Sequence, residues 1–400
     1  MKKIRNESIA RTYAGCRDNW GYNKDMLDDQ WKAIAELGTE WHSAFSKMVR
    51  SSLCDKENAV FSPVARFRAI AMLSEITDGH TRAELNSALG KKISSAERVA
   101  ALMKATLSED ETNITSRLNS SLWLDKKVVR PACELEVALE KCDTDAFVCD
   151  MMSSETEAER QKWLKAATGG GAPSDLGKAS GGEAITLFST SLFRGTWVTP
   201  FEKKKKPMKF RTDSGETVDA DFLHTLEYTA CHFGESFTAV AKHLDDAYSL
   251  WFFLPDKDVT LRDLIERNAI TELIKNPEDG DDMYYVDLSV PEFDFSTESD
   301  LKTCLSKLGI KKLFSIGADL SPISERDDLA LNRAKESARI AVNRLGVDAS
   351  SAVKLSVACM GIPPKNGELT IKLDRPFLFA LTKYDRLPLY VGALTDPTKH

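Results

Sequence analysis

The stretch from Arg344 to Asn366 reads RLGVDASSAVKLSVACMGIPPKN, and it carries two conflicting patterns. From Val347 onwards, small or apolar residues alternate with mostly polar ones, which predicts a strand across a core. Gly346 opens the stretch with a permissive backbone, and Pro363 and Pro364 close it without ladder donors. The alternating set is Val347, Ala349, Ser351, Val353, Leu355 and Val357 on one face, and Asp348, Ser350, Ala352, Lys354, Ser356 and Ala358 on the other.

Composition sets the class of protein. The 400 residues are 42% hydrophobic and 29% charged, with a formal net charge of −7. These values are typical of a globular protein, and the negative charge disfavours nucleic acid or an anionic membrane as a partner. The basic start MKKIRNESIARTYAG is not followed by an apolar stretch, so we expect no export signal. This favours a cytoplasmic protein, or an extracellular one if a leader has been removed.

Metal, cofactor and catalytic signatures are not evident in the sequence. The eight cysteines are scattered without a Cys-x-x-Cys pair, so we expect neither a zinc site nor a disulfide scaffold, and most thiols should be buried and free. The six histidines fit no catalytic motif, so we expect no enzyme, no cofactor and no metal. The basic run Lys203–Lys206 could bind a polyanion, although such runs are more often solvated surface.

Helical and strand patterns occupy different parts of the chain. Residues 28–52 and 64–76 have apolar residues at helical spacing, and the second segment begins after Ser62 and Pro63. Thr81 and Glu84 predict a capping box for a helix ending at Gly90. Branched and aromatic residues predict strands in the later part of the chain, which indicates an α+β fold. The predicted strands cover residues 184–198, 237–244, 248–255, 284–293, 337–343, 367–373, 376–383 and 388–395.

Four separated phrases follow one another along the chain: NAVFSPVARFRAIAMLSEITDGHTRAELNSALG (58–90), TSLFRGTWVTPF (190–201), VDLSVPEFDFSTESDLKTCLSKLGIKKLFSIGADLSPIS (286–324) and DRPFLFALTKYDRLPLYVGALTDP (374–397). Taken in this order, they resemble the serpin family of serine protease inhibitors. The resemblance implies one domain over residues 36–400, with helices packed on a large, mostly antiparallel central sheet, and smaller sheets beside it. Residues 1–35 then form an N-terminal extension of unknown role.

The same resemblance assigns the opening stretch a role that explains its conflicting patterns. Residues 346–366 correspond to the reactive centre loop, which is exposed as bait and inserts into the central sheet as a new strand after a protease cuts it. Counting fourteen residues from Gly346, as the family pattern does, places the reactive bond at Met360-Gly361. A register slip would move it to Cys359 or Ala358. The flanking bait is Val357, Ala358, Cys359, Ile362 and Pro363, and the hinge is Gly346, Val347, Asp348, Ala349, Ser350 and Ser351.

Three positions depart from the family pattern. Arg344 stands two residues before the hinge glycine, where inhibitory members usually carry glutamate. Ser189 and Glu336 align with positions that usually hold asparagine and histidine in a hydrogen-bonded cluster beneath the sheet, beside a matching Ser62. These departures bear on whether the chain inhibits or only folds like an inhibitor.

The bait residue predicts the target. Methionine is unbranched and apolar, so it suits the pockets of elastase-like or chymotrypsin-like serine proteases. We therefore expect a monomeric suicide inhibitor that forms a covalent acyl complex with such a protease. The alternatives are a non-inhibitory serpin with a carrier, storage or binding role, an inhibitor of a cysteine protease, a cysteine hydrolase using Cys359, and a simple binding module.

Overall fold

The computed structural model describes most of the chain. The described residues are 2–4, 42–53, 57–90, 114–128, 139, 144–170, 178, 182–244, 248–275, 282–331, 333–348, 367–384 and 387–399. No helix among these residues is both long and apolar enough to cross a membrane.

The N-terminal helices follow the apolar periodicity, with one correction. Residues 42–53 are helical, and α2 (Pro63–Glu75) is capped by Ser62, whose hydroxyl accepts a hydrogen bond from the backbone of Ala65. Helix α3 (Gly79–Leu89) ends at Gly90 as predicted, but the predicted capping box is wrong. Asp78 is the cap, and the Thr81 hydroxyl instead accepts a hydrogen bond from Asp319 at 2.9 Å. The helix cap therefore lies three residues earlier than the sequence indicated.

A seven-stranded sheet contains the segment quoted at the start of the sequence analysis. Its order is β1-β4-β3-β5-β15-β14-β13, and its pairings are mostly antiparallel. The strands are β1 (Lys2–Ile4), β3 (Ile114–Asp125), β4 (Asp145–Cys149), β5 (Ile185–Thr196), β13 (Phe293–Asp300), β14 (Arg333–Val342) and β15 (Gly346–Val347). Strand β1 pairs with β4 at the sheet edge and belongs to the predicted N-terminal extension.

The remaining strands form a nine-stranded sheet and a small hairpin of β7 (Met208–Arg211) and β8 (Thr217–Ala220). The larger sheet has more strands than the seven-stranded one, because the 13-residue strand β9 pairs with β12 along one part and with β10 along another, and so joins two groups. Its strands are β2 (Ala59–Phe61), β6 (Glu202–Lys203), β9 (Phe222–Gly234), β10 (Phe237–His243), β11 (Tyr248–Pro255), β12 (Asp282–Pro291), β16 (Glu368–Lys372), β17 (Phe377–Lys383) and β18 (Leu387–Leu394).

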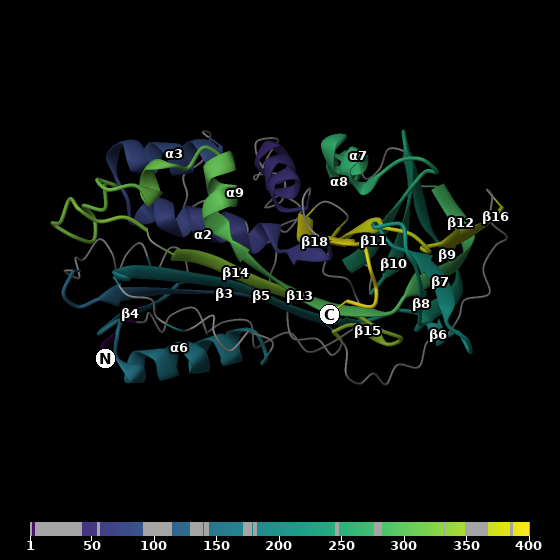
Figure 1. Cartoon of the computed structure of the whole chain (residues 1–400), viewed down its shortest axis with the longest axis horizontal. Helices are drawn as coiled ribbons and strands as arrows, with labels where there is room; N and C mark the ends of the chain where they lie inside the picture. Colours follow the sequence, from purple (N-terminus) through teal and green to yellow (C-terminus); the bar gives the residue numbers. More distant parts are fainter. Residues whose placement is uncertain are drawn as a thin grey trace, which may run out of the picture.

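The helices cover both faces of the seven-stranded sheet. In Figure 1, α2, α3 and α9 (Leu301–Lys307) lie on one face, and α6 (Ser154–Ala167) lies on the other. The short helices α7 (Leu261–Glu266) and α8 (Ala269–Lys275) lie by the nine-stranded sheet, and η1 (Lys312–Phe314) is a single 3-10 turn. Most of α2 is buried, and this helix packs against one face of the seven-stranded sheet. The single α+β domain predicted from the sequence is confirmed.

Candidate functional site

Strand β15 is the first part of the predicted hinge, and it lies inside the seven-stranded sheet. Val347 pairs with Val342 of β14 and with Gly195 of β5, while Gly346 pairs with Thr196. The Val347 side chain is only 3% exposed. The chain that leads into the reactive loop therefore occupies the start of a strand position between β5 and β14.

A tight turn joins β14 to β15 and places β15 between β5 and β14. The side-chain oxygen of Asn343 accepts hydrogen bonds from the backbone of Leu345 (2.8 Å) and Gly346 (3.2 Å). Trp197 donates from its backbone to the Leu345 carbonyl at 2.9 Å, which fixes the turn to the end of β5. A Cβ atom at Gly346 would lie 1.9 Å from the Gly195 carbonyl oxygen. Close approach of two backbones therefore requires glycine at the opening of the hinge.

Asp348 is held by one arginine from each neighbouring strand. Arg194 of β5 donates to its carboxylate at 3.0 Å, and Arg339 of β14 donates to the other oxygen at 2.6 Å. Arg339 also contacts Asp294 of β13 at 2.7 Å. Asp348 has a φ of 47°, and its backbone amide donates to Ala341. We call this group, Arg194, Asp348, Arg339 and Asp294, the hinge clamp.

The boundary between β5 and β14, here called the seam, is paired at its two ends and not in the middle. The two strands form parallel ladder pairs at three positions, from Thr186 with Arg333 to Phe188 with Lys335. At the other end, β15 lies between them. Between these ends, residues 189–194 of β5 and 336–340 of β14 form no ladder pair with each other, although both segments are fully described. These two segments are the open part of the seam.

The three residues predicted to lie beneath the sheet meet where the seam opens. Ser189 donates to the Ala65 carbonyl at 2.9 Å, and the backbone of Ser62 donates to Glu336 at 3.1 Å. Glu336 also forms an ion pair with Arg66, with 2.6 Å between the Arg66 Nη2 and Glu336 Oε2 atoms. Both side chains of this pair are at least 95% buried. Glu336 therefore ties β14 to the start of α2 through a charge pair.

The paired end of the seam carries a second buried charge group. Glu183, just before β5, accepts from Arg160 of α6 at 3.2 Å and from Arg333 of β14 at 3.1 Å. The Arg160 side chain is fully buried, and its burial lowers its pKa while Glu183 acts in the opposite direction. Thr186 also accepts a hydrogen bond from Arg160 at 3.2 Å. This group, Arg160, Glu183 and Arg333, links α6 to both strands of the seam.

All of the predicted bait, the predicted reactive bond and the second half of the predicted hinge lie outside the described residues. These positions are Ala349, Ser350, Ser351, Val357, Ala358, Cys359, Met360, Gly361, Ile362 and Pro363. Sequence reasoning missed Arg66, which sits within an apolar helix pattern, and the hinge clamp, whose members are up to 154 residues apart. Asp348 was expected only as an outward hinge residue. A search for opposite charges at the ends of adjacent strands would have been needed to find its partners.

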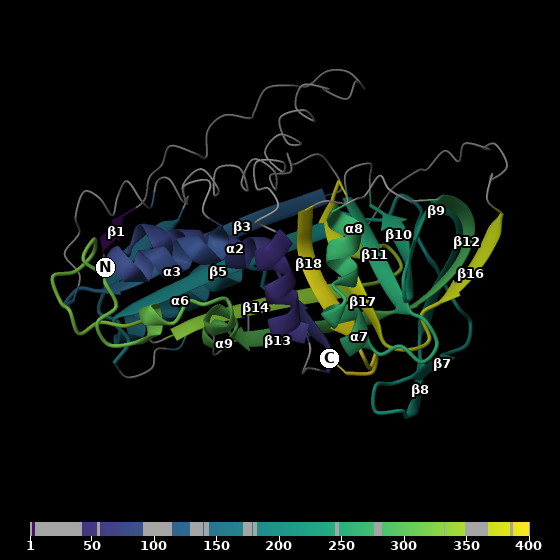
Figure 2. The same ribbon diagram turned by 90° about the horizontal axis from the view of Figure 1, so that it is seen from above.

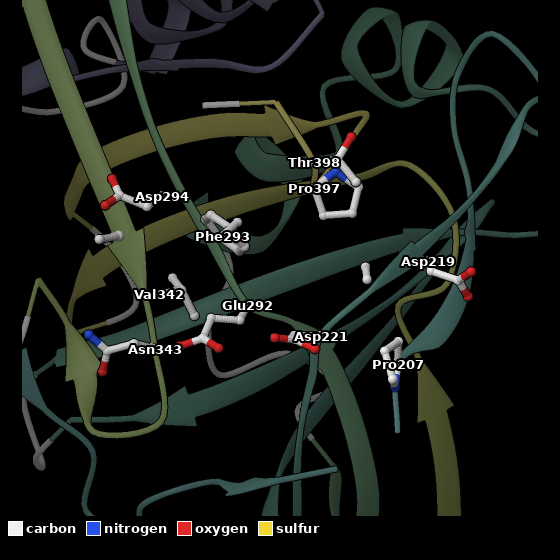
Figure 3. Close-up of a pocket in the computed structure, with 12 residues that line it drawn as sticks. Pro207, Asp219, Asp221, Glu292, Phe293, Asp294, Val342, Asn343, Pro397 and Thr398 are labelled. Atoms are coloured by element: carbon white, nitrogen blue, oxygen red, sulfur yellow. The ribbon is translucent and has the colours of Figure 1, made fainter. Parts of the chain in front are cut away.

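An open pocket of about 570 Å³ lies beside the end of β14 (Figure 3). Its lining includes Asp219, Asp221, Glu292 and Asp294, but each carboxylate has a basic partner: Lys209 for the first, Lys203 for the next two and Arg339 for the last. Throughout the described ranges, no group of three or more His, Cys, Asp or Glu side chains is placed to hold a metal. The Lys203 charge is satisfied within the protein, which leaves the predicted polyanion site to Lys204, Lys205 and Lys206.

The segment predicted to be the hinge lies between two strands of the central sheet, next to a stretch where the two described strands form no ladder pair with each other. The family described as Serpin (serine protease inhibitor) matches residues 42–397, and the chain belongs to this family. Serpins as a class are protease inhibitors and not catalysts. The resemblance inferred from the four sequence phrases is thereby confirmed.

Relatives and solved structures agree with this assignment. The chain is 27% identical over 357 residues to alpha-1-antitrypsin-like protein GS55-MS of Ictidomys tridecemlineatus, covering 86% of this chain and 84% of the relative. It is 26% identical over 391 residues to alpha-1-antiproteinase of Rattus norvegicus, covering 94% and 92%. Its fold is similar to the native thermophilic serpin tengpin (TM-score 0.78, 24% identity, covering 89% and 94%). It is equally similar to human thyroxine-binding globulin (TM-score 0.78, 20% identity, covering 93% and 100%).

Proposed function

We propose that this serpin is a suicide inhibitor of elastase-like or chymotrypsin-like serine proteases, cleaved at Met360-Gly361. The observation that carries the proposal is the position of β15. Gly346 and Val347 already form the first residues of a strand between β5 and β14, and the open part of the seam lies directly ahead of them. Residues 349–360 would continue along this path after cleavage, drawing the acylated protease with them.

The sequence of the loop supports insertion over simple exposure. Val353, Leu355 and Val357 share the face of Val347 by strand alternation, and burial of each stabilises the inserted form by about 1.5 to 3 kcal/mol. Each new ladder hydrogen bond adds about 1 kcal/mol. In the uncut chain, both ends of the loop are tethered, so it does not insert and does not gain this free energy. The uncut form is therefore metastable, and a kinetic barrier maintains it until cleavage frees one end. An insertion of about fourteen residues moves the protease on the order of 45 Å, which can distort its active site before water releases the acyl group.

The test is incubation with pancreatic elastase and chymotrypsin, followed by a denaturing gel. An inhibitor gives a heat- and SDS-stable complex, and sequencing of its released peptide should begin at Gly361. Clipping without a complex overturns inhibition, and a new N-terminus elsewhere overturns the assigned bond. A cysteine protease such as papain serves as the comparison, and a stable complex with papain alone would favour the cysteine protease alternative.

Exchange of the bait residue tests the target class separately. Met360→Arg should shift inhibition from elastase-like enzymes towards trypsin, because arginine suits an acidic specificity pocket and methionine an apolar one. Unchanged preference in this variant would mean that Met360 does not enter the specificity pocket. Met360→Leu is the matched control, since it keeps an apolar side chain and should retain elastase inhibition after treatment with an oxidant that converts methionine to its sulfoxide.

A non-inhibitory serpin is the second candidate, and the Glu336–Arg66 pair favours it. This buried ion pair anchors β14 to α2 at the point where the seam must widen, and Arg344 replaces the usual glutamate before the hinge. Thyroxine-binding globulin, which has a similar fold, is named for binding thyroxine, a small ligand. If this candidate is correct, cleavage will release active protease, and the cleaved chain will gain little thermal stability.

A further inference from the structure

Three large apolar side chains lie together on the outer face of the strands at one end of the molecule. Leu226 and Tyr228 of β9 are 64% and 45% exposed, and Tyr285 of β12 is paired directly with Tyr228. The two tyrosine rings are 5.5 Å apart between centroids. We call Leu226, Tyr228 and Tyr285 the aromatic patch. In Figure 1 and Figure 2, its strands lie beside β16 at the right-hand end of the molecule.

Strand alternation places the patch on the solvent side of the sheet. On the opposite face of these strands, Thr225, Val286 and Leu288 are buried, and Glu227 pairs with the buried Lys242, while Leu226 and Tyr228 project to the solvent side. The rim is polar: Asp287 is opposite Leu226, and Glu368 and Thr370 of β16 are opposite Tyr285 and Asp287. An apolar, tyrosine-bearing centre with a polar rim is the usual anatomy of a protein-binding surface, and tyrosine is among the residues that dominate binding energy.

The reactive loop returns to the fold at this patch. The backbone amide of Tyr285 donates to the carbonyl of Gly367, and Tyr285 is the ladder partner of Glu368. Met360 is seven residues before Gly367 in the sequence, so even a fully extended chain keeps it within about 25 Å of the edge of the patch. A protease domain of about 230 residues has a radius of gyration of about 17 Å, hence a radius of roughly 22 Å. A protease docked at Met360 is therefore wide enough to reach the patch.

We propose that the aromatic patch is a second contact site for the target protease, used in the encounter that precedes cleavage. The inference rests on the proposed function for the identity of the partner. The matching protease surface would present an apolar side chain to Leu226 and the tyrosine rings, with a hydrogen-bond donor towards Glu368, because Asp287 is already paired with His224 at 2.9 Å. The patch would then add affinity and specificity that the bait sequence alone does not supply.

The test measures non-covalent binding, so that it does not depend on trapping. Elastase and chymotrypsin with the active-site serine replaced by alanine are titrated against wild type, Leu226→Ala and Tyr228→Ala, and Kd is measured by surface plasmon resonance. Each patch variant should raise Kd about tenfold, mainly through faster dissociation. Ile316→Ala is the matched control, because Ile316 is an 81% exposed apolar residue that is not part of the patch, and its Kd should equal that of wild type.

The outcomes separate the patch from the proposed function. Wild-type binding that is weakened by the patch variants, without any covalent complex with active protease, overturns inhibition and supports the patch. Equal Kd values for the patch variants and wild type overturn the patch and leave inhibition standing. Wild type that elutes as a dimer dispersed by Tyr228→Ala, with unchanged protease binding, overturns the patch as a protease site and assigns it to a second copy of this chain. Thermal unfolding of each variant confirms that the exposed substitutions leave the fold intact.

Discussion

Glu336 of β14 connects the central sheet to helix α2 through two contacts. Its carboxylate accepts from the backbone of Ser62 and forms the ion pair with Arg66, in an environment with almost no solvent. Arg66 also donates to Ser52 in the helix spanning residues 42–53, and its guanidinium lies over the Phe61 ring. Because water does not reach these side chains, removal of one partner leaves the other charge buried and uncompensated, which is costly.

We predict that Glu336→Gln lowers the stability of the intact protein by about 3 to 5 kcal/mol, because it leaves the Arg66 charge buried without its counter-charge. Urea unfolding monitored by fluorescence measures the change. The matched control is Glu298→Gln, which removes one partner of a surface pair whose side chains are each about one-third exposed, and it should change stability by less than about 1 kcal/mol. A double variant, Arg66→Met with Glu336→Leu, should recover much of the loss, and equal stability of the two Gln variants would refute the role given to the pair.

Burial governs the chemistry of the described thiols. Cys149, Cys231 and Cys304 are buried and free, as the sequence predicted for most cysteines. Burial raises the pKa of the Cys149 thiol above its ordinary value, so little thiolate forms near neutral pH. In the native protein at pH 8, a thiol reagent should leave Cys149 unmodified, as mapped by peptide mass spectrometry, whereas in urea the same peptide should be labelled fully.

The sign of the pH dependence follows from the same shift. Because the unfolded chain loses the Cys149 proton at a lower pH than the folded chain does, the contribution to stability is complete below about pH 9 and is lost as pH rises through the folded pKa. Cys149→Ala should therefore show a shallower loss of stability above pH 9 than wild type. A steeper loss in the variant would contradict the assignment.

At the scale of elements, a substitution in the hinge should affect trapping of the protease without affecting cleavage of the loop. Val347 is the first inward side chain of β15, so Val347→Arg places a charge in an apolar site, at a cost of several kcal/mol. We expect this variant to be cleaved at Met360-Gly361 at nearly the wild-type rate but to release active protease. Val347→Ala fits the same site without charge and serves as the control, which should still form complexes. A wild-type yield of covalent complex from Val347→Arg would show that β15 is not the route of insertion.

The ion pairs of the hinge clamp are partly exposed to solvent, so salt should weaken them. The Arg194 and Arg339 side chains are 48% and 38% exposed, so each bond to Asp348 contributes at most about 1 kcal/mol. Asp348→Asn should speed hydrogen exchange of the Val347 amide several-fold, because the hinge leaves the sheet more often. Raising salt to about 1 M should produce the same acceleration in wild type and little more in the variant. Equal exchange in both proteins at low salt would mean that backbone pairing alone holds β15.

Individual elements show what periodicity can and cannot predict. Helix α2 was predicted because its apolar residues match the helix period over a long stretch, and strand β5 because its branched and aromatic residues favour strands. Strand β3 was missed: its Ser120 and Ser121 are both buried, on opposite faces, so no alternation marks it. The cluster of Ser62, Ser189 and Glu336 came from the family resemblance, whereas Arg66 and the hinge clamp depend on contacts between distant segments that a single sequence does not encode in a readable pattern.

At the scale of the whole molecule, cleavage should make the protein harder to melt. Insertion of residues 349–360 would fill the open part of the seam and extend β15 into a full strand, adding ladder bonds and burying Val353, Leu355 and Val357. We expect cleaved wild type to have a Tm roughly 20 °C above that of the intact protein, measured by differential scanning calorimetry. Cleaved Val347→Arg should gain much less, and an unchanged Tm for cleaved wild type would rule out strand insertion as the working principle.

The open part of the seam also affects how copies of this protein behave towards one another. Two strand edges that face each other without a ladder between them are a template for any extended segment of suitable pattern, and the edges do not distinguish the molecule's own loop from another's. Tyr390, whose pKa is raised by burial, keeps its proton and donates to the Ser191 carbonyl, so this acceptor within the open part of the seam already has a donor. Warming a concentrated solution would widen the seam before unfolding the rest, and linked chains of otherwise native molecules are the expected form of aggregate.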